Sequence, residues 1–138
     1  MIQPGTLPLS GGRFVPFTYE IDVRGMDLTG AALLAHVRLY KNAGGSPLVN
    51  LSQVNSAASE GVRLISVGVA GGFTTSKIGI RINETTMEGL PLSSTDPLKL
   101  HAQKPDVVLA WDMHVTPAGG LKFVLLEGSF TVKGGVTQ

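Results

Sequence analysis

Histidines and acidic residues are the side chains of this sequence that could hold a metal ion or move a proton. His36 and His114 each fall on the more polar side of an alternating segment, and a metal site would need both of them together with Asp112 or Glu127. Zinc-binding motifs place their ligands at characteristic short spacings along the chain. These four residues match none of those spacings, so we predict no metal and no other cofactor.

The common signatures of a catalytic site do not occur in this sequence. There is no Gly-x-Ser-x-Gly turn around a serine, no Gly-x-Gly-x-x-Gly loop for a dinucleotide, and the acidic residues lie singly instead of as a glycosidase pair. The absence of cysteine excludes disulfides, thiolate metal sites and thiol catalysis. We therefore predict no catalytic and no cofactor-binding residues, and we do not expect an enzyme.

Trp111 and Asp112 are adjacent residues that each allow two interpretations. Trp111 shares one side of an alternating segment with Leu109 and Met113, which favours a core residue over an exposed platform for carbohydrate stacking. Asp112 is either a buried functional acid or an ordinary exposed strand residue. The alternation of the segment favours the second interpretation, because it places Asp112 on the opposite side from Trp111.

The charge pattern bears on the kind of partner. The chain has 11 basic and 10 acidic residues, scattered singly with no basic stripe, so we predict no nucleic-acid partner. Charged residues make up only 15% of the chain, which suits a protein packed against neighbours. The first residues do not read as a signal peptide, and no apolar run approaches the ~20 residues that cross a bilayer. We expect no membrane partner and no small-molecule substrate.

The segments that carry His36, His114, Trp111 and Asp112 are predicted to be strands, because apolar and polar residues alternate in them with a period of two. Residues 31–40 could also form a helix, but glycine turns on both sides favour a strand. The apolar phase slips between Leu64 and Ile65, which predicts a bulge, and residues 85–88 have the spacing of a helical turn with a capping box. The predicted strands are 15–23, 31–40, 48–51, 62–69, 76–83, 107–115 and 121–133.

These strands predict an all-β fold, an immunoglobulin-like antiparallel sandwich of about seven strands, with a jelly roll or a small barrel as the alternative. The length of 138 residues is that of one domain. We predict a single sandwich domain over residues 13–133, an extended N-terminal arm over 1–12 and a C-terminal tail over 134–138. The irregular stretch 91–105 is long for a connection, and such loops are often functional.

Three groups of segments resemble a known family. Together they are similar to the small β-sandwich domain at the N-terminus of phage baseplate upper proteins, and to related small phage tail proteins. The resemblance spans residues 14–137, and Asp-Leu-Thr-Gly at 27–30 is its most distinctive part. The loop 91–105 is longer than in that family, and the first dozen residues look added. The segments are 17–23, 27–31 and 36–38, then 78–82, 84–85 and 90–91, and finally 110–116, 125–132 and 136–137.

The resemblance implies a non-enzymatic virion structural protein that connects or decorates tail, baseplate or neck components. Its partners would be other virion proteins and copies of itself, and its location would be the virion, assembled in the host cytoplasm. One alternative is a capsid decoration (cement) protein. Another is a carbohydrate- or receptor-binding module, although only Tyr40 and Phe73 among the aromatics lie near turns.

The interface residues that we predict come from position alone, in the N-terminal arm, the long loop and the tail. They are Ile2, Pro4, Leu7, Leu9, Leu92, Pro97, Leu98, Leu100, His101 and Val136.

Overall fold

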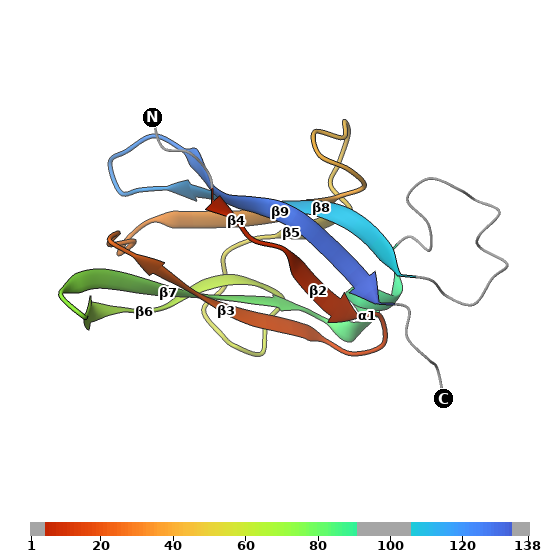
Figure 1. The fold of residues 1–138 in the computed structure, drawn as a ribbon, viewed down its shortest axis with the longest axis horizontal. Coiled ribbons are helices and arrows are strands. Elements are labelled where there is room, and N and C mark those ends of the chain that lie inside the picture. Colours follow the sequence, from red (N-terminus) through yellow and green to blue (C-terminus); the bar gives the residue numbers. More distant parts are fainter. Residues whose placement is uncertain (1–4, 91–105, 134–138) are drawn as a thin grey trace, which may run out of the picture.

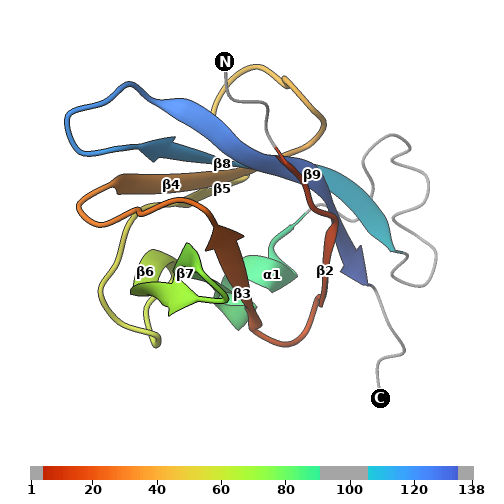
Figure 2. The same cartoon turned by 60° about the vertical axis from the view of Figure 1, so that its left-hand side comes forward.

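The structure is a computed structural model that describes residues 5–90 and 106–133. These residues form two packed β-sheets and one short helix (Figures 1 and 2). The elements are β1 (Gly5–Thr6), β2 (Leu9–Gly12), β3 (Phe17–Arg24), β4 (Ala32–Arg38), β5 (Val49–Leu51), β6 (Gly61–Ala70), β7 (Phe73–Ile82), α1 (Glu84–Glu88), β8 (Val107–Thr116) and β9 (Phe123–Lys133).

The strand order confirms the predicted all-β sandwich. The larger sheet has the order β1-β9-β8-β4-β5, with β2 also paired to β9, and the smaller sheet has the order β3-β7-β6. Neighbouring strands are antiparallel except that β1 and β2 run parallel to β9. A three-stranded sheet packed on a larger, mostly antiparallel sheet is the architecture of a β-sandwich.

The core lies between the two sheets and is filled by alternate residues of both. Leu109, Trp111 and Met113 of β8 are buried, as the alternation predicted, and they share one core cluster with inward residues of β7 such as Ile78 and Ile80. Trp111 is only 4% exposed, so its side chain is not a surface platform. The predicted strand over 31–40 is confirmed as β4, and the predicted bulge is the register shift between Leu64 and Ser66.

The Asp-Leu-Thr-Gly segment forms the turn between β3 and β4 and is bonded to the smaller sheet. The Asp27 carboxylate accepts hydrogen bonds from the backbone N–H of Thr29 at 2.9 Å and from its hydroxyl at 2.6 Å. The buried hydroxyl of Ser76 on β7 accepts from the N–H of Leu28 at 3.0 Å and donates to the carbonyl of Met26 at 2.7 Å. The turn therefore joins the two sheets through hydrogen bonds as well as through buried Leu28.

The N-terminal segment differs from the prediction. Residues 5–12 were assigned to an arm outside the domain, but they form β1 and β2 and complete the edge of the larger sheet along β9. Leu9 is buried, and the indole N–H of Trp111 donates to the carbonyl oxygen of Leu7 at 2.8 Å. The arm prediction is therefore wrong for these residues. Strands this short show little alternation, and the residues that they pair with lie far away in the sequence.

The helical turn begins earlier than the capping-box spacing predicted. Helix α1 starts at Glu84, its N-cap is Asn83, and the side chain of Asn83 makes no capping hydrogen bond. The backbone N–H of Asn83 instead donates to Glu60 at 2.8 Å, which ties the helix start to the loop before β6.

The sheet edges carry features that oppose strand addition. Glu20 and Asp22 project from edge strand β3 and lie 3.9 and 4.0 Å from Lys77 of β7. Edge strand β6 contains the bulge, and edge strand β5 is three residues long. Charges, bulges and short edge strands are the devices by which natural sheets avoid pairing with another chain.

Candidate binding site on the outer face of the larger sheet

A row of polar side chains crosses the outer face of the larger sheet. In the strand register His36 of β4 lies opposite Asp112 of β8, which lies opposite Glu127 of β9. Asn50 of β5 extends the row beyond His36, and Thr6 of β1 extends it beyond Glu127. Side chains alternate between the two faces of a strand, so the neighbours of these residues point to the core side while the polar residues point outward. Five strands therefore each contribute one polar side chain to the same row on the surface.

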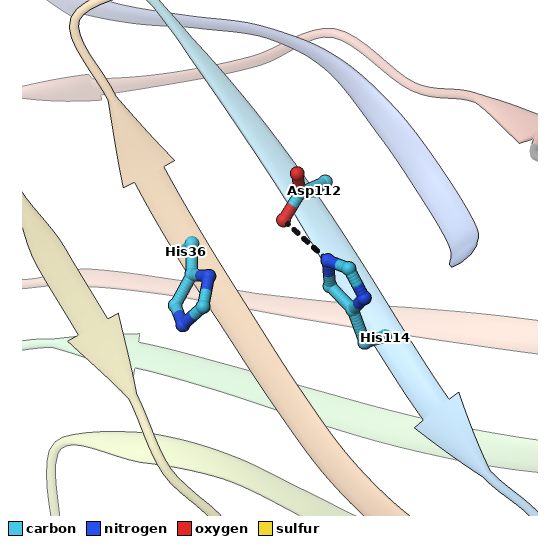
Figure 3. Close-up of side chains that lie close together, drawn as sticks. All are labelled: His36, Asp112 and His114. Atoms are coloured by element: carbon cyan, nitrogen blue, oxygen red, sulfur yellow. Dashed lines mark ion pairs between the residues drawn. The ribbon is translucent and has the colours of Figure 1, made fainter. Parts of the chain in front are cut away.

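Two residues of this row, His36 and Asp112, gather at one point with a third outer-face residue, His114. Asp112 and His114 are two residues apart on β8 and share its outer face, and His36 reaches them from β4 (Figure 3). One ligand atom from each of the three residues lies within 4.8 Å of the other two. The His114 Nε2 atom is 3.2 Å from Asp112 Oδ1, and the two imidazole rings are 6.0 Å apart.

The carboxylate of Asp112 has an unsatisfied oxygen. Its Oδ1 atom is buried and accepts no hydrogen bond from the described residues, although His114 Nε2 is close enough for an ion pair. The two atoms are therefore in contact without the alignment of a hydrogen bond. A buried acceptor without a donor costs free energy and calls for an explanation such as a water or an ion.

Arg38 is the cation closest to this cluster. Its guanidinium donates to the carbonyls of Ala43 and Gly45 in the β4–β5 loop at 3.3 and 3.1 Å, and its Nη2 atom lies 3.4 Å from Nδ1 of His36. Burial, and after it the charge of Arg38, lowers the pKa of His36, while Asp112 acts in the opposite direction. The neutral form of His36, which has a free ring lone pair, is therefore favoured.

A hollow of about 540 Å³ adjoins the cluster, between the β4–β5 loop and the outer faces of β8 and β9. Lys41 and Glu127 form an ion pair of 3.4 Å at this hollow, and the exposed ring of Tyr40 also lines it. It combines an aromatic ring with both signs of charge, a combination suited to polar ligands.

A second hollow of about 420 Å³ lies over the outer face of the smaller sheet. Its charged lining residues are Glu20, Arg63 and Arg81, and Arg81 is held by Asn83 through a hydrogen bond of 2.9 Å. The described lining residues include no group of imidazoles and carboxylates like that on the larger sheet. The larger sheet is therefore the better candidate.

The predicted interface residues fare differently. Leu9 is buried in the core and Leu7 packs against it, so neither is a free contact surface. The other eight lie outside the described residues, namely Ile2, Pro4, Leu92, Pro97, Leu98, Leu100, His101 and Val136. The residues that the sequence analysis named for a metal site, His36, His114 and Asp112, do come together, and Glu127 lies beside Asp112. Their spacing gave no such signal, because the register of β4 against β8 creates the cluster.

In a comparison with known proteins, no family model and no curated protein matches the chain. Among the described residues, no helix has the length and apolar character needed to cross a membrane.

Proposed function

We propose that this domain is a non-catalytic structural protein of a phage virion, which joins tail, baseplate or neck components through protein contacts. The resemblance of the segments around residues 27–30 to the sandwich domain of phage baseplate upper proteins supports the proposal. The two-sheet architecture is compatible with it. The partners are other virion proteins and copies of this chain, and the location is the virion.

One end of the sandwich, here called the turn end, is formed by the β3–β4 turn (25–31), the β6–β7 turn (71–72) and the β8–β9 connection (117–122), at the left in Figure 1. Contacts hold these segments together. The N–H of Gly25 donates to the carbonyl of Thr74 at 2.6 Å, and a Cβ at Gly30 would lie 3.5 Å from that of Ala118. The β3–β4 turn thus connects the other two.

The observation that carries the proposal is the exposure of large apolar side chains at the turn end. Val69 and Phe73 flank the β6–β7 turn and are 77% and 52% exposed, and Leu121 in the β8–β9 connection is 88% exposed. Val69 and Phe73 lie on both sides of one turn, and exposed apolar side chains at such positions can take part in protein–protein contacts. Charges on β3, the bulge in β6 and the shortness of β5 oppose strand addition at those edges, so we propose contact through the turn end instead.

The test is an electron-microscopy reconstruction of native particles of the phage that encodes the chain. A ring of this domain at the tail, baseplate or neck is the expected result. A triple variant Val69→Ser, Phe73→Ser and Leu121→Ser should lose incorporation into particles. The control Tyr40→Ser with Leu48→Ser, which removes exposed apolar groups from the β4–β5 loop, should retain it.

Two outcomes of the reconstruction would contradict the connector role. Density for the domain over the capsid lattice would indicate a capsid decoration protein instead. If the particles lack the domain altogether, the domain is not a virion protein.

The hollow beside Tyr40 favours a second candidate, a carbohydrate- or receptor-binding module. Aromatic rings beside polar groups suit the alternating apolar and hydroxyl faces of a sugar. If this candidate is correct, the purified domain should bind host cell-surface polysaccharide. Tyr40→Ala and Glu127→Gln should each weaken that binding. Equal binding by both variants and the unaltered domain would exclude the hollow as the site.

A further inference from the structure

We propose that His36, Asp112 and His114 form a binding site for one divalent transition-metal ion, zinc by preference, on the outer face of the larger sheet. The first support is the convergence of three ligand side chains from two paired strands, with all three ligand atoms within 4.8 Å of one another. Asp112 and His114 form an ion pair of 3.2 Å, whereas the described residues show no hydrogen bond or ion pair from His36 to either of them.

The distances suit a zinc ion. Two ligands that are each about 2.0–2.1 Å from zinc at a tetrahedral angle lie about 3.3 Å apart. Asp112 Oδ1 and His114 Nε2 are already 3.2 Å apart. The ring nitrogen of His36 must move toward them by at most about 1.5 Å to complete the set, which a rotation of its half-buried side chain can supply.

The unsatisfied oxygen of Asp112 gives independent support. Oδ1 is buried and has no hydrogen-bond donor among the described residues, and its contact with His114 Nε2 is an ion pair only when that imidazole is protonated. Neighbouring ligands of one ion are placed in this way, because each directs its lone pair to the ion instead of to the other. When His114 is neutral the ion pair is lost, and a cation between the two atoms would then satisfy the carboxylate oxygen.

The ligand chemistry selects the class of ion. Two imidazoles and one carboxylate suit zinc and related transition metals, whereas calcium and magnesium prefer sites made of oxygen atoms. The His114 and Asp112 side chains are 23% and 30% exposed, so the site is reached from solvent. Water or a partner's side chain can take the remaining position, as in open three-ligand zinc sites.

Positive charges near the site oppose the binding of a metal cation. Arg38 lies 3.4 Å from His36 Nδ1, and Lys122 acts on His36 from a longer range. Because a guanidinium only donates, Arg38 occupies the lone pair of that nitrogen, and a metal bound through Nδ1 would have to displace it. The charge of Arg38 must therefore weaken the binding of a divalent ion, and its removal should strengthen binding.

The test uses the full chain without an affinity tag, treated with EDTA and then titrated with zinc chloride by calorimetry. We expect one ion per chain, and visible absorption bands of a four-coordinate site when cobalt(II) is used. His36→Gln, His114→Gln and Asp112→Asn should each weaken binding by about 100-fold or more. Arg38→Met should strengthen it by about tenfold, since one opposing charge is lost.

His101→Gln is the matched control, because it removes the remaining histidine of the chain. It should bind zinc as the unaltered protein does. In the unaltered protein, one equivalent of zinc should shift the imidazole NMR signals of His36 and His114 and leave those of His101 in place, a readout that does not depend on the folding of any variant.

Several results would overturn the site. These are no stoichiometric zinc binding by the unaltered chain, retained binding in both His36→Gln and His114→Gln, loss of binding in His101→Gln, or no gain with Arg38→Met. Zinc binding in solution requires no virion, so these results are independent of the particle reconstruction that tests the proposed function.

Discussion

The indole N–H of Trp111 donates a hydrogen bond of 2.8 Å to the carbonyl oxygen of Leu7, which lies 104 residues earlier in the chain. The bond ties the link between β1 and β2 to the centre of the larger sheet. The backbone N–H of Leu7 donates to the backbone carbonyl oxygen of Glu127 on β9 at 2.9 Å. Leu7 is thus bonded through both of its backbone polar groups, which fixes the first strands against the last one.

Trp111→Phe should lower the free energy of unfolding by about 1–2 kcal/mol, because it removes this bond and leaves a part-buried carbonyl without its donor. Urea denaturation measures the change. Hydrogen exchange should also become faster at the amides of β2 while that of β4 amides stays close to the unaltered rate. Equal protection of β2 in both proteins would show that the bond does not hold the N-terminal strands.

Gly128→Ala should also release the N-terminal segment, since a Cβ at this position would clash with the carbonyl oxygen of Leu7. We expect a loss of about 1–3 kcal/mol in the free energy of unfolding. Gly68→Ala is the control, because a Cβ there meets no atom within 4 Å, and its effect should stay within about 0.5 kcal/mol. Similar losses for both variants would point to a general intolerance of alanine in these strands.

Ser76→Ala should destabilise the domain by about 2–3 kcal/mol, because it removes the partner of the Leu28 N–H and of the Met26 carbonyl in a buried position. Thermal or urea unfolding measures the change. Ser66→Ala makes the same substitution at an exposed position of β6 and should have little effect. If Ser76→Ala were as mild as this control, the hydroxyl would not be what joins the turn to the smaller sheet.

The Asp27 turn should give a pH-dependent contribution to stability. Hydrogen bonds from the Thr29 hydroxyl, and next from its backbone N–H, lower the pKa of Asp27. A lowered carboxyl pKa means that the contribution is fully present above the unfolded pKa of about 4 and is lost as the pH falls through the lower pKa of the folded state.

Asp27→Asn does not titrate, so it serves as the reference for that contribution. The difference in urea midpoint between the unaltered protein and Asp27→Asn should be constant above about pH 5 and shrink below about pH 4. A difference that stays constant down to about pH 2 would show that the carboxylate charge does not contribute.

Alternation predicted the fold where strands are long and have one apolar side. The segments that became β7 and β8 alternate over eight or more residues, and their inward sides lie in the core. In β3 the alternation predicted buried Phe17 and Ile21 correctly, but Tyr19 on the same side is 42% exposed. β1 and β2 were missed because two and four residues carry too little alternation to be distinguished from an arm. Their structure depends on pairing with β9, a contact that local sequence does not encode.

The candidate site could be predicted only in part. The positions of Asp112 and His114 two residues apart on a strand already place both on one face. Which residue of β4 lies opposite them depends on register, and the register is set by the packing of the inward side chains of both strands. His36 was recognised as polar and outward, but its position across from Asp112 was not evident from spacing.

The parallel pairing of the first strands with the last has a mechanical consequence. If the two ends of the domain are pulled apart, β1 and β2 are drawn one way and β9 the other, along the direction of the strands. The force then acts in shear on all hydrogen bonds between them at once, instead of opening them one by one. A domain built in this way should resist extension along this direction more strongly than one whose terminal strands separate one bond at a time.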